Sequence, residues 1–111
     1  MKGSKLYYDQ FTLGDLIGAG GFAGVYRAQQ EGRAEAVAVK LSQQPDANML
    51  ITNEAELIQK FDHQHIIKLL PIKRADKSDI YHARAGEVPG NPAFFVMEYL
   101  DGGTLAAYLQ Q

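Results

Sequence analysis

The sequence predicts an α+β domain in which a five-stranded antiparallel sheet carries one inserted helix. Short apolar segments separated by turn residues recur along the 111 residues, as expected of antiparallel strands. One longer segment, residues 48–61, instead repeats its apolar residues with a helical period. This helix falls between the third and fourth strands, and a second helix is expected to start at residues 104–109.

The strands are placed by their apolar content and by the turns between them. A glycine-rich turn, 18–24, separates the first two strands, a polar turn at 31–33 follows, and Pro71 interrupts the fourth strand. A long polar segment, 75–92, has a short strand within it at 80–83. The five main strands are expected at residues 11–17, 25–28, 36–41, 66–74 and 94–98.

Composition narrows the function classes. Apolar residues make up 46% and charged residues 22% of the chain, which favours a globular domain over disorder. A net charge of −2 argues against nucleic acid or an anionic membrane as the main partner. The absence of cysteine excludes disulfides and thiolate metal sites, and the three histidines lack the spacing of a zinc site, so no metal site is expected. No apolar run is long enough for a membrane segment or a signal peptide.

The glycine-rich turn suggests a phosphate-binding loop. Glycines allow positive φ and let backbone N–H groups approach phosphate oxygens, and this turn contains Gly18, Gly20, Gly21 and Gly24. A hairpin with no ligand is the alternative. A dinucleotide-binding turn is disfavoured because a strand, not a helix, follows the glycines, and a P-loop because no Lys-Ser or Lys-Thr follows them.

Lys40 is the one charged residue in the strand 36–41. Alternation along this strand places Val37, Val39 and Leu41 on one face, and Ala38 and Lys40 on the other. A solvated lysine on an edge strand is the common alternative. Beside a phosphate-binding loop, we interpret Lys40 as a phosphate ligand.

Glu54 is the charged residue on the apolar side of the helix 48–61. At 100° per residue, it falls in the middle of an arc formed by Leu50, Ile51, Leu57, Ile58 and Phe61. A buried carboxylate needs a cation, and Lys40 is the best candidate. The alternative is that Glu54 sits at the margin of the sheet and reaches water.

Together these motifs resemble the N-terminal lobe of a eukaryotic-type (Hanks-type) protein kinase, most like the bacterial serine/threonine kinases. The resemblance covers about residues 11–109 and rests on the order of the segments as much as on any one of them. The segments are Gly18-x-Gly20-x-Phe22-x-x-Val25, Val37-Ala38-Val39-Lys40, Asn53-Glu54, His63-Gln64-His65-Ile66, and Val96 to Leu105.

The resemblance implies a role for each matching residue. Lys40 and Glu54 would be the catalytic pair that orients the phosphates, and the helix carrying Glu54 would be the regulatory helix. Ile58 and Leu69 would belong to the regulatory spine. The ATP-binding residues would be Ile17, Gly18, Gly20, Gly21, Phe22, Val25, Ala38, Lys40, Met97 as the gatekeeper, Glu98 and Leu100 at the adenine edge, and Asp101 and Thr104 near the ribose.

The chain departs from the family pattern in three places. Ala23 stands at the third motif glycine, Gln64 stands where the family has proline, and the segment 75–92 is long. The implied domains are an N-terminal extension, 1–10, a kinase N-lobe, 11–100, and a hinge with the start of the first C-lobe helix, 101–111. The chain contains neither His-Arg-Asp nor Asp-Phe-Gly, so the Mg²⁺ ligands and the catalytic base are expected in a missing C-lobe.

The implied function is the ATP-binding lobe of a serine/threonine-type protein kinase, inactive by itself, which would meet protein substrates through the C-lobe. The alternatives are a stand-alone or pseudokinase lobe acting as a regulatory module and, less favoured, a small-molecule kinase. The location would be cytoplasmic, either as a free protein or as part of a membrane-anchored receptor kinase. Leu105, Tyr108 and Leu109 share one helical face that the C-lobe would cover, so we expect the chain to self-associate there.

Overall fold

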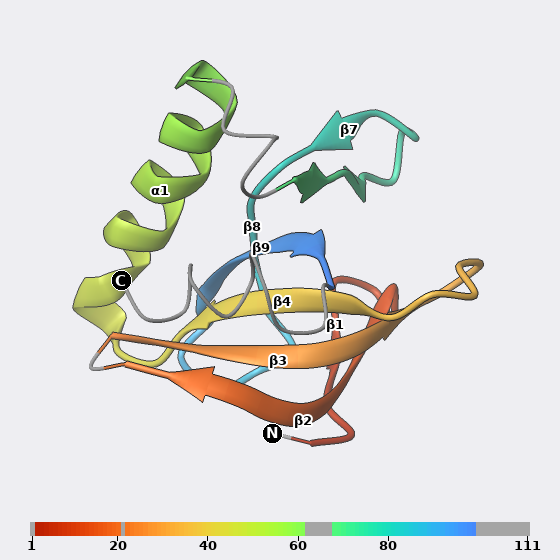
Figure 1. Cartoon of the computed structure of the whole chain (residues 1–111), viewed down its shortest axis with the longest axis horizontal. Coiled ribbons are helices and arrows are strands. Elements are labelled where there is room, and N and C mark those ends of the chain that lie inside the picture. The colour runs from red at the N-terminus through yellow and green to blue at the C-terminus, as the bar shows by residue number, and fades with distance from the viewer. Residues whose placement is uncertain (1, 21, 62–67, 100–111) are drawn as a thin grey trace.

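A computed structural model describes residues 2–20, 22–61 and 68–99 of the chain. Within them, a curled antiparallel sheet supports a single long helix, α1 (Asn48–Phe61), on one side (Figure 1). The α+β class with one inserted helix is therefore confirmed. The second helix, expected at 104–109, lies outside the described residues.

The sheet has the strand order β1-β2-β3-β4-β9-β5, and β8 also pairs with β9. All of these pairs are antiparallel. The strand β9 is central because it pairs with β4 on one side and with both β5 and β8 on the other. The strands are β1 (Lys5–Leu6), β2 (Phe11–Ala19), β3 (Ala23–Gln30), β4 (Val37–Ser42), β5 (Leu69–Leu70), β8 (Ala83–Arg84) and β9 (Ala93–Glu98).

The five predicted strands are present with altered bounds. The first two extend into the glycine turn, so β2 ends at Ala19 and β3 resumes at Ala23. Pro71 divides the fourth strand into β5 and β6 (Ile72–Lys73), because proline lacks the N–H that a ladder needs. The strand β6 pairs with β7 (Asp79–Ile80) as a separate hairpin.

The strand β1 has no counterpart in the sequence-based prediction. It pairs with β2, and Leu6 is fully buried in the core. Three successive residues after β1, Tyr7, Tyr8 and Asp9, have positive φ. The Glu87 carboxylate accepts hydrogen bonds from the N–H groups of Tyr7 (3.0 Å) and Tyr8 (2.5 Å), which ties this turn to the segment 75–92.

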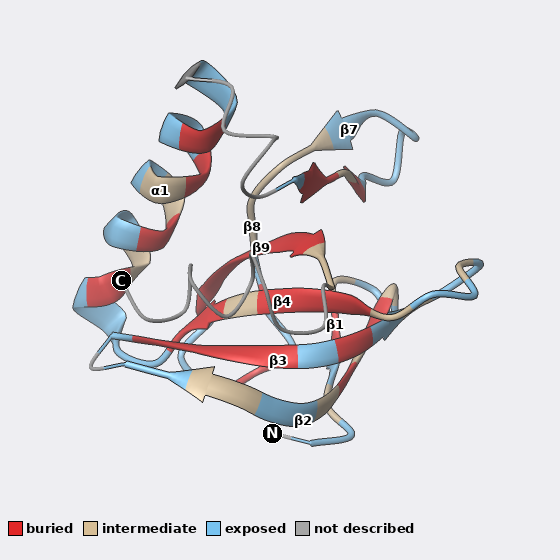
Figure 2. Cartoon of the chain, viewed as in Figure 1, coloured by how far each residue is buried: buried red, intermediate tan, exposed pale blue. Residues whose placement is uncertain are grey.

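Side chains alternate between two apolar cores, one on each face of the sheet. Most of β3, β4 and β9 is accordingly buried (Figure 2). Val37, Val39 and Leu41 point into the core that also contains Phe11 and Phe94. Ala38 points into the other core, which joins the sheet to α1. This alternation confirms the two faces predicted for this strand, and it leaves Lys40 on the helix side.

No helix within the described part of the chain has the length and apolar character needed to cross a membrane.

Candidate nucleotide site

Lys40 and Glu54 form an ion pair between β4 and α1. The Lys40 Nζ lies 2.9 Å from Glu54 Oε1 and 3.1 Å from Glu54 Oε2. The two side chains are 21% and 29% exposed, so the pair sits at the edge of the core and remains open to solvent on one side. The contact predicted from the sequence is thus present, in a setting where screening by water is only partial.

The helix holds Glu54 through a buried face different from the predicted one. Ile51, Ala55 and Ile58 are buried, whereas Leu50 and Leu57 are 50% and 52% exposed. The predicted arc was centred on Glu54 and ran from Leu57 to Ile51, whereas the observed buried face is shifted toward the isoleucines and includes the small Ala55, which the prediction overlooked. Glu54 therefore lies at the margin of the buried face, as the alternative interpretation held, and it meets Lys40 there.

An apolar surface continues from this ion pair across the sheet. Val25, Ala38 and Met97 are buried in the same core cluster as the helix face, and Ile17 packs partly buried against it. The strand registers explain this grouping, because Val25 lies opposite Lys40 and Ala38 lies opposite Met97. Four residues expected to contact adenine from the sequence are therefore brought together beside Lys40.

The glycine turn connects β2 to β3 next to this surface. The Gly20 N–H donates a hydrogen bond to the Ala23 carbonyl (2.9 Å), and Phe22 at the tip is 58% exposed. Neither Gly20 nor Gly24 has positive φ, so the expectation of a left-handed backbone is wrong for these two glycines. Gly21 lies outside the described residues.

Gly24 is instead closely surrounded by neighbouring side chains. A Cβ at this position would come within 2.8 Å of Gln43 Nε2 and 3.1 Å of Leu16 Cδ1. Both atoms are the ends of exposed, flexible side chains that can move aside, so a Cβ at this position would require only a local shift. Further along the hairpin, the β2–β3 register shifts between Leu13 and Gly18, as at a β-bulge, and such irregularities often occur next to functional sites.

The end of β9 borders an open cleft of about 610 Å³ that begins at Ile17. The Glu98 N–H donates to the Lys68 carbonyl (3.0 Å), and the Arg27 guanidinium lies 5.6 Å from the centre of the Tyr99 ring. Arg27 and Tyr99 both line the cleft, and neither was predicted as a site residue. Arg27 could have been found, because it lies two residues after Val25 and so shares its face of the strand. The predicted residues Leu100, Asp101 and Thr104 lie outside the described part of the chain.

Comparisons with known proteins identify the family to which this arrangement of sheet and helix belongs. The protein kinase domain family matches residues 11–111. The chain therefore belongs to the protein kinase domain family, and its order of strands and helix is that of the N-terminal lobe of the domain.

Several curated kinases resemble the chain over most of its length. CBL-interacting protein kinase 30 of Oryza sativa subsp. japonica is 31% identical over 97% of this chain and 21% of its own length. The serine/threonine-protein kinase mos of Xenopus laevis is 31% identical over 88% of this chain and 25% of its own length. The tyrosine-protein kinase transforming protein ros of UR2 avian sarcoma virus is 27% identical over 92% of this chain and 24% of its own length. The chain thus spans about a fifth to a quarter of these relatives, and they do not bear out the suggested likeness to bacterial kinases.

Proposed function

We propose that this chain is the ATP-binding lobe of a protein kinase of the serine/threonine type, whose whole enzyme transfers the γ-phosphoryl group of ATP to a protein hydroxyl. The observation that carries the proposal is the Lys40–Glu54 ion pair, 2.9 Å long, beside a glycine turn and a continuous apolar surface. An apolar surface with a few fixed polar groups is the usual form of a small-molecule site.

The described residues fit the adenine and phosphate parts of ATP. Val25, Ala38 and Met97 are buried and Ile17 is partly buried in one apolar cluster beside Lys40, and this cluster would contact the adenine ring. In kinases of this family, Mg-ATP supplies the phosphoryl group that is transferred. Lys40 would bind the phosphate oxygens, and Glu54 would hold the ammonium group in place so that little side-chain entropy is lost on binding.

The fit does not extend to magnesium. Within the described ranges, no group of three or more histidine and acidic side chains lies close enough to hold a metal ion. We therefore assign no step to magnesium on these residues. Glu98, Leu100, Asp101 and Thr104 remain proposed contacts for the adenine edge and the ribose.

The test uses the full-length kinase that carries this lobe. We expect Lys40→Met to remove most phosphoryl transfer to a protein substrate, whereas Lys5→Met, an exposed lysine on β1, should retain it. Peptide substrates offering only serine, threonine or tyrosine would decide the hydroxyl class. Normal turnover by Lys40→Met, with the Lys5 variant equally active, would refute the role of Lys40.

The chain by itself is expected to bind Mg-ATP weakly and to lack kinase activity. Titration calorimetry should give a dissociation constant in the high micromolar range or weaker, on the order of −5 kcal/mol. Steady autophosphorylation by the purified chain, if Lys40→Met abolishes it, would contradict the expected lack of kinase activity.

A further inference from the structure

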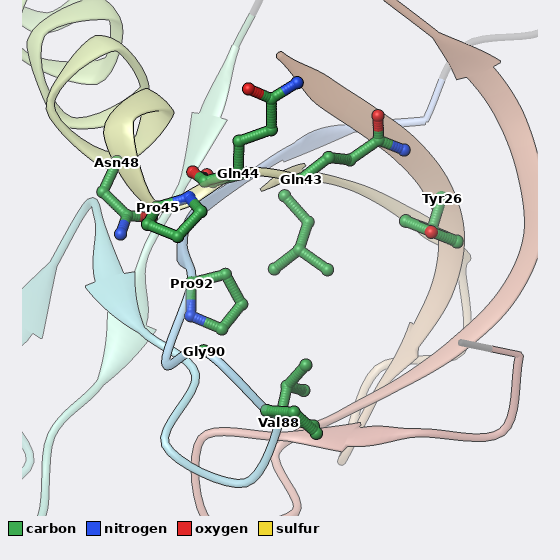
Figure 3. Close-up of a pocket in the computed structure, with 11 residues that line it drawn as sticks. Tyr26, Gln43, Gln44, Pro45, Asn48, Val88, Gly90 and Pro92 are labelled. Atoms are coloured by element: carbon green, nitrogen blue, oxygen red, sulfur yellow. Dashed lines mark hydrogen bonds between the residues drawn. The ribbon is translucent and has the colours of Figure 1, made fainter. Parts of the chain in front are cut away.

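A second cavity lies on the sheet face opposite Lys40 (Figure 3). It encloses about 330 Å³, at the small end of the range for ligand pockets. Its walls come from three places: the outer side of β3 and β4 through Tyr26 and Leu41, the residues leading into α1, and the loop 88–92. Figure 3 shows Tyr26 on one side of the space and Pro45 and Pro92 on the other.

Hydrogen bonds within the chain fix the walls of this cavity. The Asn48 Oδ1 accepts from the Ala93 N–H (2.8 Å), and Ser42 Oγ donates to the Gln44 carbonyl (2.7 Å). The loop closes on itself, with the Asn91 N–H donating to the Val88 carbonyl (3.0 Å). A ligand entering the cavity would therefore meet walls that are already formed, which lowers the entropic cost of binding.

The lining residues define the chemistry of a ligand. None of the eleven is charged, so a charged ligand would lose hydration without gaining a counter-charge. The Tyr26 ring and the prolines offer flat apolar surfaces, suited to a planar ring. The Gln43 amide carries both a donor and an acceptor, and Asn48, whose Oδ1 already accepts from the Ala93 N–H, adds N–H donors; together they suit an amide-like group on that ring.

The cavity also contacts both parts of the candidate nucleotide site. The Gln43 N–H donates to the Phe22 carbonyl (2.8 Å) at the tip of the glycine turn. Asn48 is the first residue of α1, the helix that carries Glu54. A ligand between Gln43 and Asn48 would therefore contact the residue that is hydrogen-bonded to Phe22 and the first residue of α1 together.

We propose that this cavity is a regulatory site for a compact, uncharged ligand with a planar ring and an amide-like edge. Its occupation stabilises the positions of the glycine turn and of α1. The binding site stands on the cavity alone, whereas its regulatory effect rests on the proposed nucleotide function.

Nuclear magnetic resonance can test the site on the ¹⁵N-labelled whole chain, with benzamide as the probe. We expect a dissociation constant in the millimolar range, as is usual for a fragment of this size. The largest amide shifts should fall on Gln43, Asn48, Val88 and Gly90, with smaller shifts at Phe22. Benzoate and benzylammonium, which match benzamide in size but carry a charge, should bind at least about tenfold more weakly.

Two variants and a control make the test specific. Val88→Phe fills the cavity and should weaken benzamide binding at least about tenfold, because it removes the volume the ring needs. Gln43→Ala, on an exposed side chain, should weaken binding severalfold without affecting the fold. Gln29→Ala, an exposed glutamine outside the cavity, should change nothing.

The outcomes separate this proposal from the nucleotide function. Absence of shifts at the cavity residues up to about 10 mM benzamide, shifts centred on Ala38 and Met97, or equal binding of benzoate would overturn the site. Binding at the cavity without any shift at Phe22 or in α1 would overturn the regulatory effect. If Lys40→Met keeps normal turnover in the full-length kinase while benzamide still shifts the cavity residues of this chain, the nucleotide proposal fails and the cavity site stands.

Discussion

Two neighbouring residues of α1 provide a sharp test of how the helix packs. Ile58 is 6% exposed and faces the sheet, whereas Leu57 is 52% exposed on the other side. Replacing a buried isoleucine with alanine costs about 2–5 kcal/mol through lost transfer energy and the cavity left behind. Alanine is the better helix former by a few tenths of a kcal/mol, so we expect Ile58→Ala to lower the free energy of unfolding by about 3 kcal/mol.

Leu57→Ala serves as the matched control, because it removes a side chain of equal size from the same helical turn. Only about half of that side chain is buried, so the loss should be about 1 kcal/mol or less. Urea unfolding followed by far-UV circular dichroism gives both values, since α1 contributes the helical signal. A loss for Leu57→Ala as large as that for Ile58→Ala would show that the helix buries its leucine side and would refute the packing described above.

Three further predictions concern the helix start, the N-terminal turn and self-association. Asn48→Ala should lower the free energy of unfolding by about 1 kcal/mol and speed hydrogen exchange at the Ala93 amide, with Asn53→Ala, which is exposed, as the control. Burial opposes ionisation of Glu87, but the N–H groups of Tyr8, Glu87 and Tyr7 outweigh it, so the pKa of Glu87 lies below its usual 4.5. The stability that this carboxylate contributes is present above pH 4.5 and is lost as the pH falls through the lowered pKa. Glu87→Gln removes this titration, so the urea concentration at its unfolding midpoint should fall less on acidification than that of the unchanged chain. Light scattering over a concentration series should show self-association that Leu105→Asp and Tyr108→Asp weaken; a chain monomeric at all concentrations would contradict the proposed interface.

Periodicity was sufficient to place the helix but not to orient it. The predicted bounds of α1, Asn48–Phe61, agree with the structure because Pro45 and the polar residues before it stop the preceding strand. The orientation depended on which apolar side chains meet the sheet, and counting large ones gave Leu50 and Leu57 the same weight as Ile51 and Ile58. A small residue such as Ala55 contributes little to an apolar arc, yet it marks the closest approach of two packed elements.

The N-terminal turn and the strand β1 gave no usable signal. Lys5–Leu6 is too short to show alternation, and tyrosine rarely adopts the positive φ found at Tyr7 and Tyr8. This turn is specified by a contact 79 or 80 residues away, at Glu87, which periodicity cannot detect. By contrast, the site face of β4 was predictable, because alternation alone places Ala38 and Lys40 together.

The position of Glu54 raises a question that the sequence left open, namely what holds α1 against the sheet. In the structure, the buried face of α1 packs into the core beside Lys40, and Asn48 ties the start of the helix to β9.

Glu56 adds a contact on the other flank of the helix. Its Oε2 lies 3.5 Å from the His82 Nε2 in the segment 75–92, an ion pair when the imidazole is protonated. These contacts join α1 to the sheet at its start and along its length, and they place Glu54 within 2.9 Å of Lys40. The long segment 75–92 therefore supports both the helix, through His82, and the N-terminal turn, through Glu87. In a lobe stabilised in this way, Lys40 would already be oriented when a nucleotide binds. No part of the binding free energy would then be needed to bring Lys40 and Glu54 together.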